Sequence, residues 1–226
     1  MLESFFTLIG YGLCHQIPER SYFAGGYQLP VCARDTGIYL GFIAGLVVLW
    51  LLHRSARPSA PPRWPVLVVL GVFVGAMAID GVTSYIGLRE TTNTLRLVTG
   101  LLTGWSIATI TVPMLNAQLW VRPGIGRVLA ERWQVLVWLV AAGCTYLLAA
   151  YVLPQLGVLY PALVAGAILV TFTSVNLVLV CLVPRFEGRA RRLRDAWPQM
   201  SIAFALTVAE LGASAWLRVV TERLLS

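Results

Sequence analysis

Six stretches of the chain are apolar for long enough to cross a membrane as helices. A membrane-spanning helix needs about 20 consecutive, mainly apolar residues, and acidic and basic residues are rare within these stretches. The pattern therefore predicts an all-α integral membrane protein, organised as a six-helix transmembrane bundle. The predicted spans are roughly 36–52, 65–86, 95–115, 134–153, 158–183 and 200–218.

The first thirteen residues, MLESFFTLIGYGL, are also apolar but too short to span a membrane. They lack the basic start and the small-residue cleavage site of a signal peptide. We therefore expect an interfacial or re-entrant helix that brings Cys14 to the membrane surface. Residues 1–35 are predicted to form a small N-terminal lobe, and residues 36–226 the transmembrane domain.

Composition agrees with this interpretation, because 58% of the residues are hydrophobic and only 12% are charged. Soluble domains have about 25% charged residues. All 17 basic residues are Arg, and the net charge is +7. In a soluble protein such a charge would suggest a nucleic-acid partner. In a membrane protein, loop arginines set orientation, so we expect the lipid bilayer as partner and no nucleic acid.

The arginines concentrate in every second loop. The segments 53–64, 116–133 and 184–198 are rich in Arg, whereas 80–94 and 154–157 are poor in it. The positive-inside rule places the three rich segments in the cytoplasm. We therefore predict a multi-pass protein of the cell inner (plasma) membrane, with both termini and the N-terminal lobe on the extracytoplasmic side.

This alternation also predicts which polar groups share one side of the membrane. The N-terminal lobe, the end of the second span and the start of the third lie on the same side, whichever way the protein is oriented. Their polar side chains can therefore converge on one outer vestibule. These residues are Cys14, His15, Cys32, Arg34, Asp35, Asp80, Asn93 and Arg96.

Small residues recur every fourth position in the first three spans. Such faces let helix backbones approach closely in lipid. We therefore expect spans one to three to form a compact core against which spans four to six pack. The repeats are Gly37, Gly41 and Gly45 in the first span, Gly71 and Gly75 in the second, and Gly100 and Gly104 in the third.

Cys14, His15, Cys32 and Asp35 are the candidate metal ligands. Thiolate, imidazole and carboxylate suit zinc or a similar divalent metal, and a C-x-x-D step at a helix start can turn both side chains toward one point. Adjacent Cys and His side chains tend to point apart, so one of the two is a candidate for a supporting group. Two simpler interpretations stay open: a Cys14–Cys32 disulfide, and Asp35 as an ordinary helix N-cap.

Three further polar residues are candidates for catalysis near this vestibule. Asp80 comes too early in the second span to have left the membrane, and intramembrane carboxylates usually face a cavity or a partner. We expect Arg96 to be that partner, in a functional or a structural ion pair. Asn93 and Arg96 share one face of a helix start, which Thr91 or Thr92 can cap.

Charged groups elsewhere give two more hypotheses. Arg20, Arg34 and Arg96 at one mouth can hold a phosphate or carboxylate, or contact lipid headgroups. Glu210, a fourth candidate for catalysis, lies near the middle of the sixth span. It either is hydrogen-bonded, with Asn176 as one candidate partner, or lines a polar path.

The segment CHQIPERSYFAGGYQLPVCARDTGIYLGF resembles the opening signature of an uncharacterised family of predicted membrane proteins, catalogued as domain of unknown function 2085. The family pattern reads C-H-Q-x-P-x-R-S, then P-x-C-A-R-C-T-G-x-Y-x-G, a D-G step and an S/T-T-N-x-L-R-x-x-T-G segment. The resemblance covers about residues 11–104 and implies no established activity. The matching residues are Cys14, His15, Gln16, Pro18, Arg20, Ser21, Pro30, Cys32, Ala33, Arg34, Thr36, Gly37, Tyr39, Gly41, Asp80, Gly81, Thr92, Asn93, Leu95, Arg96, Thr99 and Gly100.

One position departs from this pattern. Asp35 stands where the family usually has the second cysteine of C-x-x-C. A thiol–disulfide enzyme working through that motif would lose its resolving sulfur. A zinc site would only exchange one anionic ligand for another. Asp35 therefore favours metal binding over redox chemistry.

Three functional hypotheses follow from the sequence. The favoured one is a zinc-like site at the extracytoplasmic mouth of spans one to three, which is structural or supports hydrolysis or binding of a lipid-linked or small anionic substrate. The second is a quinone-linked thiol–disulfide oxidoreductase that uses Cys14 and Cys32. The third is a transporter or accessory membrane subunit in which Asp80 and Glu210 mark an ion route.

Overall fold

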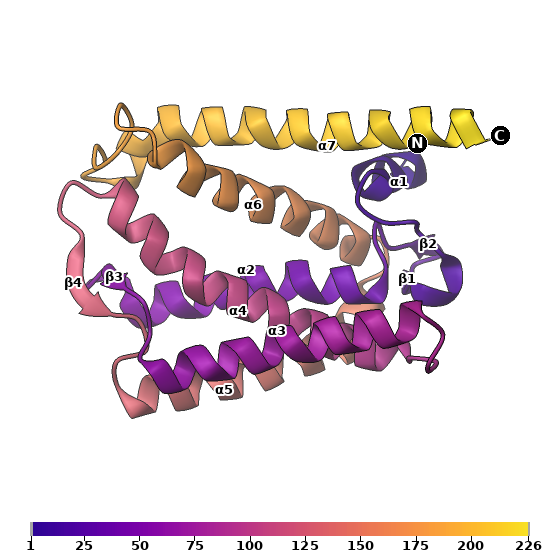
Figure 1. The fold of residues 1–226 in the computed structure, drawn as a ribbon, viewed down its shortest axis with the longest axis horizontal. Helices are drawn as coiled ribbons and strands as arrows, with labels where there is room; N and C mark the ends of the chain where they lie inside the picture. Colours follow the sequence, from indigo (N-terminus) through magenta and orange to yellow (C-terminus); the bar gives the residue numbers. More distant parts are fainter. Residues whose placement is uncertain (1, 226) are drawn as a thin grey trace.

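The computed structural model describes residues 2–225 and shows a mostly helical bundle (Figure 1). Six of its helices are long and apolar enough to cross a membrane, which confirms the six-span prediction. They are α2 (Ala33–His53), α3 (Trp64–Tyr85), α4 (Asn93–Leu119), α5 (Arg132–Leu147), α6 (Leu159–Cys181) and α7 (Trp197–Leu225). A π-helical turn (Leu148–Val152) and a 3-10 turn (Leu153–Leu156) extend α5.

Local sequence explains where several of these helices begin and end. Thr92 caps α4, because its side-chain oxygen accepts a hydrogen bond from the backbone N–H of Leu95 at 3.2 Å. Gly157, with a φ of 57°, makes the turn between the end of the fourth span and α6. The last helix runs seven residues beyond the predicted end at 218. An ion pair between Arg218 and Glu222, one turn apart, supports this extension.

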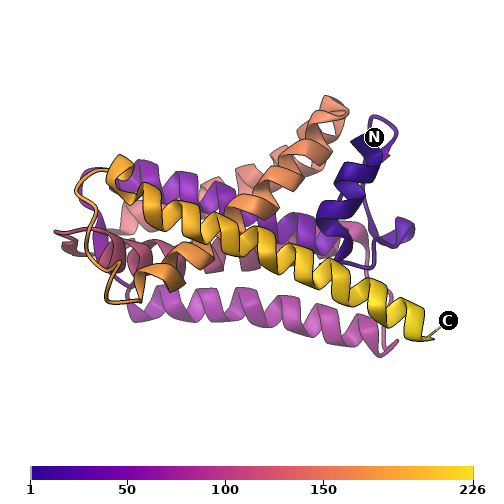
Figure 2. The same ribbon diagram turned by 90° about the horizontal axis from the view of Figure 1, so that it is seen from above.

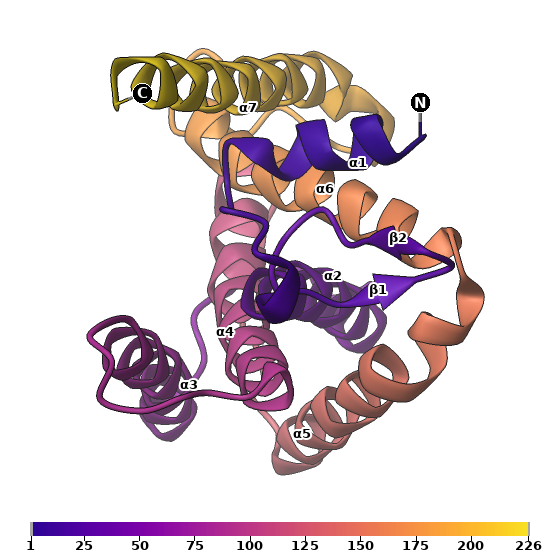
Figure 3. The same cartoon turned by 90° about the vertical axis from the view of Figure 1, so that its right-hand side faces the viewer.

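Helix α2 lies at the centre of the bundle, with the other long helices around it (Figure 3). Its closest neighbour is α4, and glycines on both helices make that approach possible. A Cβ atom on Gly37 or Gly41 would overlap backbone atoms of α4, and one on Gly104 would overlap the carbonyl oxygen of Ile38. The predicted glycine contact between the first and third spans is confirmed, and it sets the two helices in register.

The expected glycine contact of the second span is wrong. A Cβ atom on Gly71 or Gly75 would meet no other heavy atom within 4 Å in the described structure. Helix α3 packs on α4 instead through larger side chains, including the buried Val66 and Leu70. Spacing alone does not reveal which face of a helix meets a neighbour.

The N-terminal segment sits at one end of the bundle. Helix α1 (Leu2–Tyr11) lies where α6 and α7 diverge and contacts both of them (Figure 2). A 3-10 turn (Pro18–Arg20) and a hairpin of β1 (Phe23–Ala24) and β2 (Tyr27–Gln28) follow. The short first helix that the sequence predicts is therefore present, and the chain returns from it directly into α2.

The opposite end of the bundle carries the three arginine-rich loops. There β3 (Pro58–Ala60) pairs in parallel with β4 (Gly124–Arg127), and a 3-10 turn (Leu193–Ala196) precedes α7. Figure 1 shows this end on the far side of the molecule from α1. The arginine-rich loops and the N-terminal segment thus lie at opposite ends of the spans, as the alternation of charges requires.

Candidate functional site

Cys14, Cys32 and Asp35 form a cluster at the N-terminal end of α2. One ligand atom from each of the three side chains lies within 4.8 Å of the others. Cys14 follows the turn that ends α1, Cys32 is the N-cap residue of α2, and Asp35 lies in its first turn. Both cysteines are free thiols in the structure. Two thiols and a carboxylate in this arrangement can hold a divalent metal ion.

Gln16 holds the segment that carries the two cysteines in place through several hydrogen bonds. This residue takes a left-handed backbone conformation, with a φ of 54°. Its side-chain amide donates to the carbonyl oxygens of Thr7 at 2.9 Å and Pro30 at 2.8 Å. Its own carbonyl oxygen accepts from the side chain of Gln28 at 2.8 Å. Gln16 therefore joins α1 to the segment before Cys32.

The last helix also contributes to the position of Cys14. The guanidinium of Arg218 on α7 donates to the carbonyl oxygens of Tyr11 at 2.6 Å and Cys14 at 2.7 Å. It also stacks on the Tyr11 ring at 4.2 Å. Sequence reasoning missed this contact. The number of spans did indicate that such a contact was possible, because the end of the sixth span lies on the same side of the membrane as Cys14.

The two sulfur atoms differ in their affinity for a proton. The backbone N–H of Cys32 donates to the Cys14 sulfur at 3.3 Å. A side-chain hydrogen bond from Cys32, together with backbone donors, lowers the pKa of the Cys14 thiol from 9.0 to about 7 despite its partial burial. The same side-chain hydrogen bond, with burial and the nearby Asp35, raises the pKa of Cys32. Cys14 is thus the cysteine that becomes the thiolate first.

His15 does not join this cluster of ligand atoms. Its side chain is exposed, and the group within 4.8 Å consists of the two cysteines and the aspartate. His15 does line the cavity next to the cluster. The structure thus has His15 beside the three ligand atoms and not among them.

A cavity of about 230 Å³ adjoins the cluster and carries positive charge. Cys14, Cys32 and Asp35 lie in its wall together with His15. Its other polar lining residues are Arg20, Arg34, Arg96, Ser84 and Tyr85. The N-terminal segment, α2, α3 and α4 all contribute to this lining. The lining residues of these four segments therefore converge on one cavity, as the sequence predicted.

The expected pairing of Asp80 with Arg96 is wrong. The Asp80 carboxylate, whose side chain is 1% exposed, instead binds Arg34 and Arg89, each at 2.5 Å. It also accepts a hydrogen bond from the Thr91 hydroxyl at 2.6 Å. Asp80 lies behind the cavity wall, and its oxygen atoms are taken up by these three donors. The loop after α3 folds back over the helix end, which brings Arg89 closer than Arg96.

Arg96 faces the cavity without an acidic partner among the described residues. Its side chain is buried, and its guanidinium donates to the side-chain oxygen of Asn93 at 3.2 Å. The Asn93 amide in turn donates to the carbonyl oxygen of Glu19 at 3.1 Å. Asn93 therefore ties the start of α4 to the N-terminal segment and orients Arg96, rather than lining the cavity itself.

Glu210 lies elsewhere, on α7. The side-chain amide of Asn176 on α6 donates to its carboxylate at 2.8 Å and to the Thr207 hydroxyl at 3.1 Å. The hydrogen bond between Asn176 and Glu210 agrees with the sequence hypothesis. The remaining cysteines, Cys144 and Cys181, do not belong to the cluster of Cys14; Cys181 is buried, which fits a packing role, whereas Cys144 is exposed.

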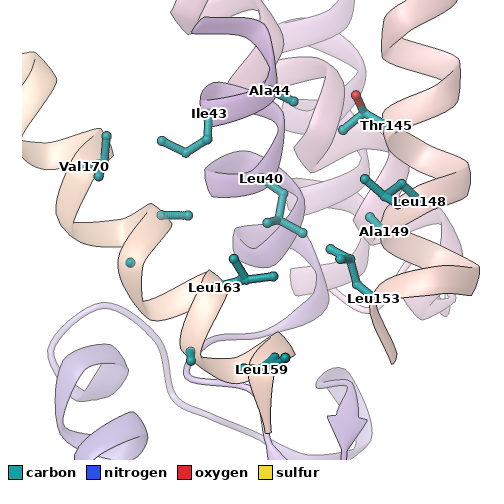
Figure 4. Close-up of a pocket in the computed structure, with 13 residues that line it drawn as sticks. Leu40, Ile43, Ala44, Thr145, Leu148, Ala149, Leu153, Leu159, Leu163 and Val170 are labelled. Atoms are coloured by element: carbon teal, nitrogen blue, oxygen red, sulfur yellow. The ribbon is translucent and has the colours of Figure 1, made fainter. Parts of the chain in front are cut away.

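A larger cavity of about 570 Å³ lies between α2, α5 and α6, apart from this cluster (Figure 4). Aliphatic side chains such as Leu40, Leu153 and Leu163 line it, and Thr145 supplies a hydroxyl. Such a wall can hold a hydrocarbon chain but offers no acid, base or metal ligand. The smaller polar cavity is therefore the candidate functional site.

Comparison with known proteins places the site within a family. A family model described as Predicted membrane protein (DUF2085) matches residues 14–110, which include the cluster and α2 to most of α4. An uncharacterized protein of Methanocaldococcus jannaschii is 36% identical over 102 residues, which are 45% of this chain and 63% of that relative. An uncharacterized protein of Methanothermobacter thermautotrophicus is 37% identical over 99 residues, 44% of this chain and 84% of the relative. No solved structure matches the chain. This chain spans less than two thirds of the first relative and most of the second, and it belongs to the DUF2085 family of predicted membrane proteins.

Proposed function

We propose that this polytopic membrane protein binds a divalent metal ion of the zinc type through Cys14, Cys32 and Asp35. The observation that carries the proposal is the approach of their three ligand atoms to within 4.8 Å. Thiolate and carboxylate ligands are those that zinc accepts, and the lowered pKa of Cys14 favours its anionic, metal-binding form. Metal binding would release the proton that the Cys32 thiol donates to the Asp35 carboxylate at 3.3 Å.

The fourth position of the proposed site faces the polar cavity. Structural zinc sites have four protein ligands, whereas catalytic sites have three and keep one position for water or substrate. The exposed His15 lies outside the cluster but lines the same cavity. We propose that His15 acts as a neighbouring acid–base or supporting group, and that the open position receives a ligand from the cavity.

The charges around the cavity favour an anionic ligand or substrate. Arg20 and Arg96 line it without an acidic partner among the described residues, whereas Asp80 neutralises Arg34. Guanidinium groups bind phosphate and carboxylate through paired hydrogen bonds. The cavity lies where the N-terminal segment meets the membrane helices, so a small anion or the phosphate of a lipid-linked molecule can reach it. By the positive-inside rule this is the extracytoplasmic side.

Hydrolysis is the reaction that this arrangement supports best. A bound zinc ion would lower the pKa of a water molecule and polarise a phosphoryl or carbonyl oxygen. Arg20 and Arg96 would hold the anionic group of the substrate in the cavity. Asn93 would keep Arg96 in position through its hydrogen bond. Asp80 would keep Arg34 from binding Asp35 in place of the metal.

Elemental analysis of the purified 226-residue chain tests the metal proposal. We expect about one zinc or similar metal ion per chain in the wild type, nearly complete loss in Cys32→Ser, and full retention in Cys144→Ser, the control for thiol content. His15→Ala is expected to retain the metal, because His15 lies outside the cluster. Absence of bound metal from wild-type protein prepared without chelators would refute the proposal.

A quinone-linked thiol–disulfide oxidoreductase is the second candidate, and the proximity of the Cys14 and Cys32 sulfur atoms supports it. Oxidation of the two thiols to a disulfide would release two electrons and two protons, which reduce a quinone to a quinol. The aliphatic cavity is a place for such a quinone. However, Leu40 in its wall is eight residues beyond Cys32, roughly 12 Å along α2. Direct thiol attack on a quinone requires contact, so this distance favours the metal site.

Mass spectrometry of thiol-blocked protein distinguishes the two candidates. The metal proposal predicts that a blocking reagent labels both cysteines once a chelator has removed the metal. A quantitative Cys14–Cys32 disulfide in freshly purified protein would instead support the oxidoreductase and exclude thiolate ligation.

A further inference from the structure

The three arginine-rich loops meet at the end of the bundle opposite Cys14. The backbone N–H of Gly124 donates to the carbonyl oxygen of Arg57 at 3.0 Å, which joins the first loop to the second. The N–H of Val121 donates to the carbonyl oxygen of Ala190 at 3.0 Å, which joins the second to the third. These loops are separated in sequence by whole transmembrane helices, yet backbone hydrogen bonds hold them as one layer.

This layer encloses a cavity of about 320 Å³ whose charged lining residues are Arg57, Arg122 and Arg191. The Arg57 guanidinium lies 3.8 Å from the centre of the Trp120 ring and donates to the carbonyl oxygen of Arg191 at 3.3 Å. These contacts fix Arg57 at the cavity. No acid among the described residues pairs with the guanidinium of Arg122 or of Arg191.

A mainly apolar cavity of about 360 Å³, whose wall also carries His53, Arg54 and Asn116, begins at the same arginine. Arg57 and Trp120 line it, together with Leu49 and Trp50 of α2, Leu177 of α6 and Met200 of α7. The basic and the apolar cavity thus share Arg57, so a molecule with an anionic head and a hydrocarbon chain fits across the two. A soluble anion would use only the basic half.

We propose that the cavity of Arg57, Arg122 and Arg191 binds the phosphate group of an anionic phospholipid, whose hydrocarbon chain enters the adjoining apolar cavity. Three guanidinium groups without an acid in the lining provide the charge complementarity. Basic pockets between membrane helices are suited to phospholipid headgroups. This site is independent of the metal cluster, since the two lie at opposite ends of the bundle. Its role is to hold the three loops, and through them the helix ends, in one arrangement.

Native mass spectrometry of the 226-residue chain in detergent, titrated with phosphatidylglycerol, tests the proposal. The test variant is Arg122→Gln with Arg191→Gln, and the control is Arg132→Gln with Arg185→Gln. Each pair removes one charge from the segment 116–133 and one from 184–198, and only the test pair lines the cavity. The affected side chains of both pairs are exposed, so both variants are expected to fold.

One arginine contributes about fivefold to binding of an anionic lipid, so the test pair should bind phosphatidylglycerol about thirtyfold more weakly than wild type. The control pair should bind like wild type, and phosphatidylcholine should bind more weakly than phosphatidylglycerol. The single change Arg122→Gln, with about a fivefold loss, provides the readout if the pair does not fold. Equal weakening in both pairs, or no weakening in either, would overturn the proposal. Glycerol 3-phosphate binding as tightly as phosphatidylglycerol would assign the cavity to a soluble anion instead.

Discussion

The guanidinium of Arg34 and the carboxylate of Asp80 form an ion pair at 2.5 Å that joins the start of α2 to the end of α3. Arg34 is the residue directly before Asp35, so this ion pair bears on the proposed metal cluster. Asp80 is almost fully buried, whereas Arg89, its second basic partner, is 44% exposed. One carboxylate therefore holds two helix ends and a loop in place.

Replacement of Asp80 by Asn should destabilise the protein by about 2–3 kcal/mol. Two guanidinium groups would lose their shared anion, and the cost is reduced because Arg89 can still reach water. Thermal unfolding in one detergent, compared with wild type, measures this effect. Glu90→Gln is the matched control, since Glu90 is an exposed acid in the loop that carries Arg89. An equal effect of both substitutions would show that net charge, rather than the ion pair, matters.

The close approach of α2 and α4 should make Gly104 intolerant of side chains. Gly104→Leu is expected to cost about 3 kcal/mol or more, because its Cβ atom would overlap the backbone of α2 at Ile38. Gly71→Leu, on the open face of α3, should change stability by less than about 0.5 kcal/mol. The midpoint of thermal unfolding of the two variants provides the comparison. Normal stability of Gly104→Leu would contradict the observed contact between the helices.

The hydrophobic pattern was sufficient to predict the six spans, because a membrane requires long apolar helices whatever they pack against. The shared side of Cys14, Cys32 and Arg96 followed from counting these crossings. The partner of Asp80 did not follow, because the path of the loop that carries Arg89 depends on tertiary packing. The contact expected at Gly71 was wrong for a related reason. The spacing of Gly71 matches that of Gly37, but the rotation of α3 turns Gly71 away from the neighbouring helices. Arg218 was missed because its contact with Cys14 joins residues that lie 204 positions apart.

The lowered pKa of Cys14 predicts an unusual pH dependence of alkylation in metal-free protein. Because the thiolate reacts, the rate should rise as pH increases through about 7 and level off above it. A thiol with the ordinary pKa of 9.0 would react slowly throughout this range. Peptide mapping after iodoacetamide treatment at several pH values measures the rate at Cys14 itself. A half-maximal rate near pH 9 would show that the hydrogen bonds from Cys32 do not stabilise the thiolate.

Two substitutions of Asp35 distinguish metal binding from thiol–disulfide chemistry. If Asp35 is a metal ligand, Asp35→Asn removes an anionic donor and should weaken metal affinity roughly 100-fold. Asp35→Cys replaces one anionic ligand by another that zinc accepts, so the metal content should stay at wild-type level. In a thiol–disulfide enzyme the same Asp35→Cys change would restore a C-x-x-C motif and allow a disulfide between Cys32 and the introduced cysteine. Metal content and free-thiol content, measured on the same samples, separate these outcomes.

Asp195→Asn, which changes an acid at the far end of the bundle, is the control for net charge. Loss of metal from Asp35→Asn but not from Asp35→Cys or Asp195→Asn is the expected pattern, and wild-type metal content in all three variants would remove Asp35 from the ligand set.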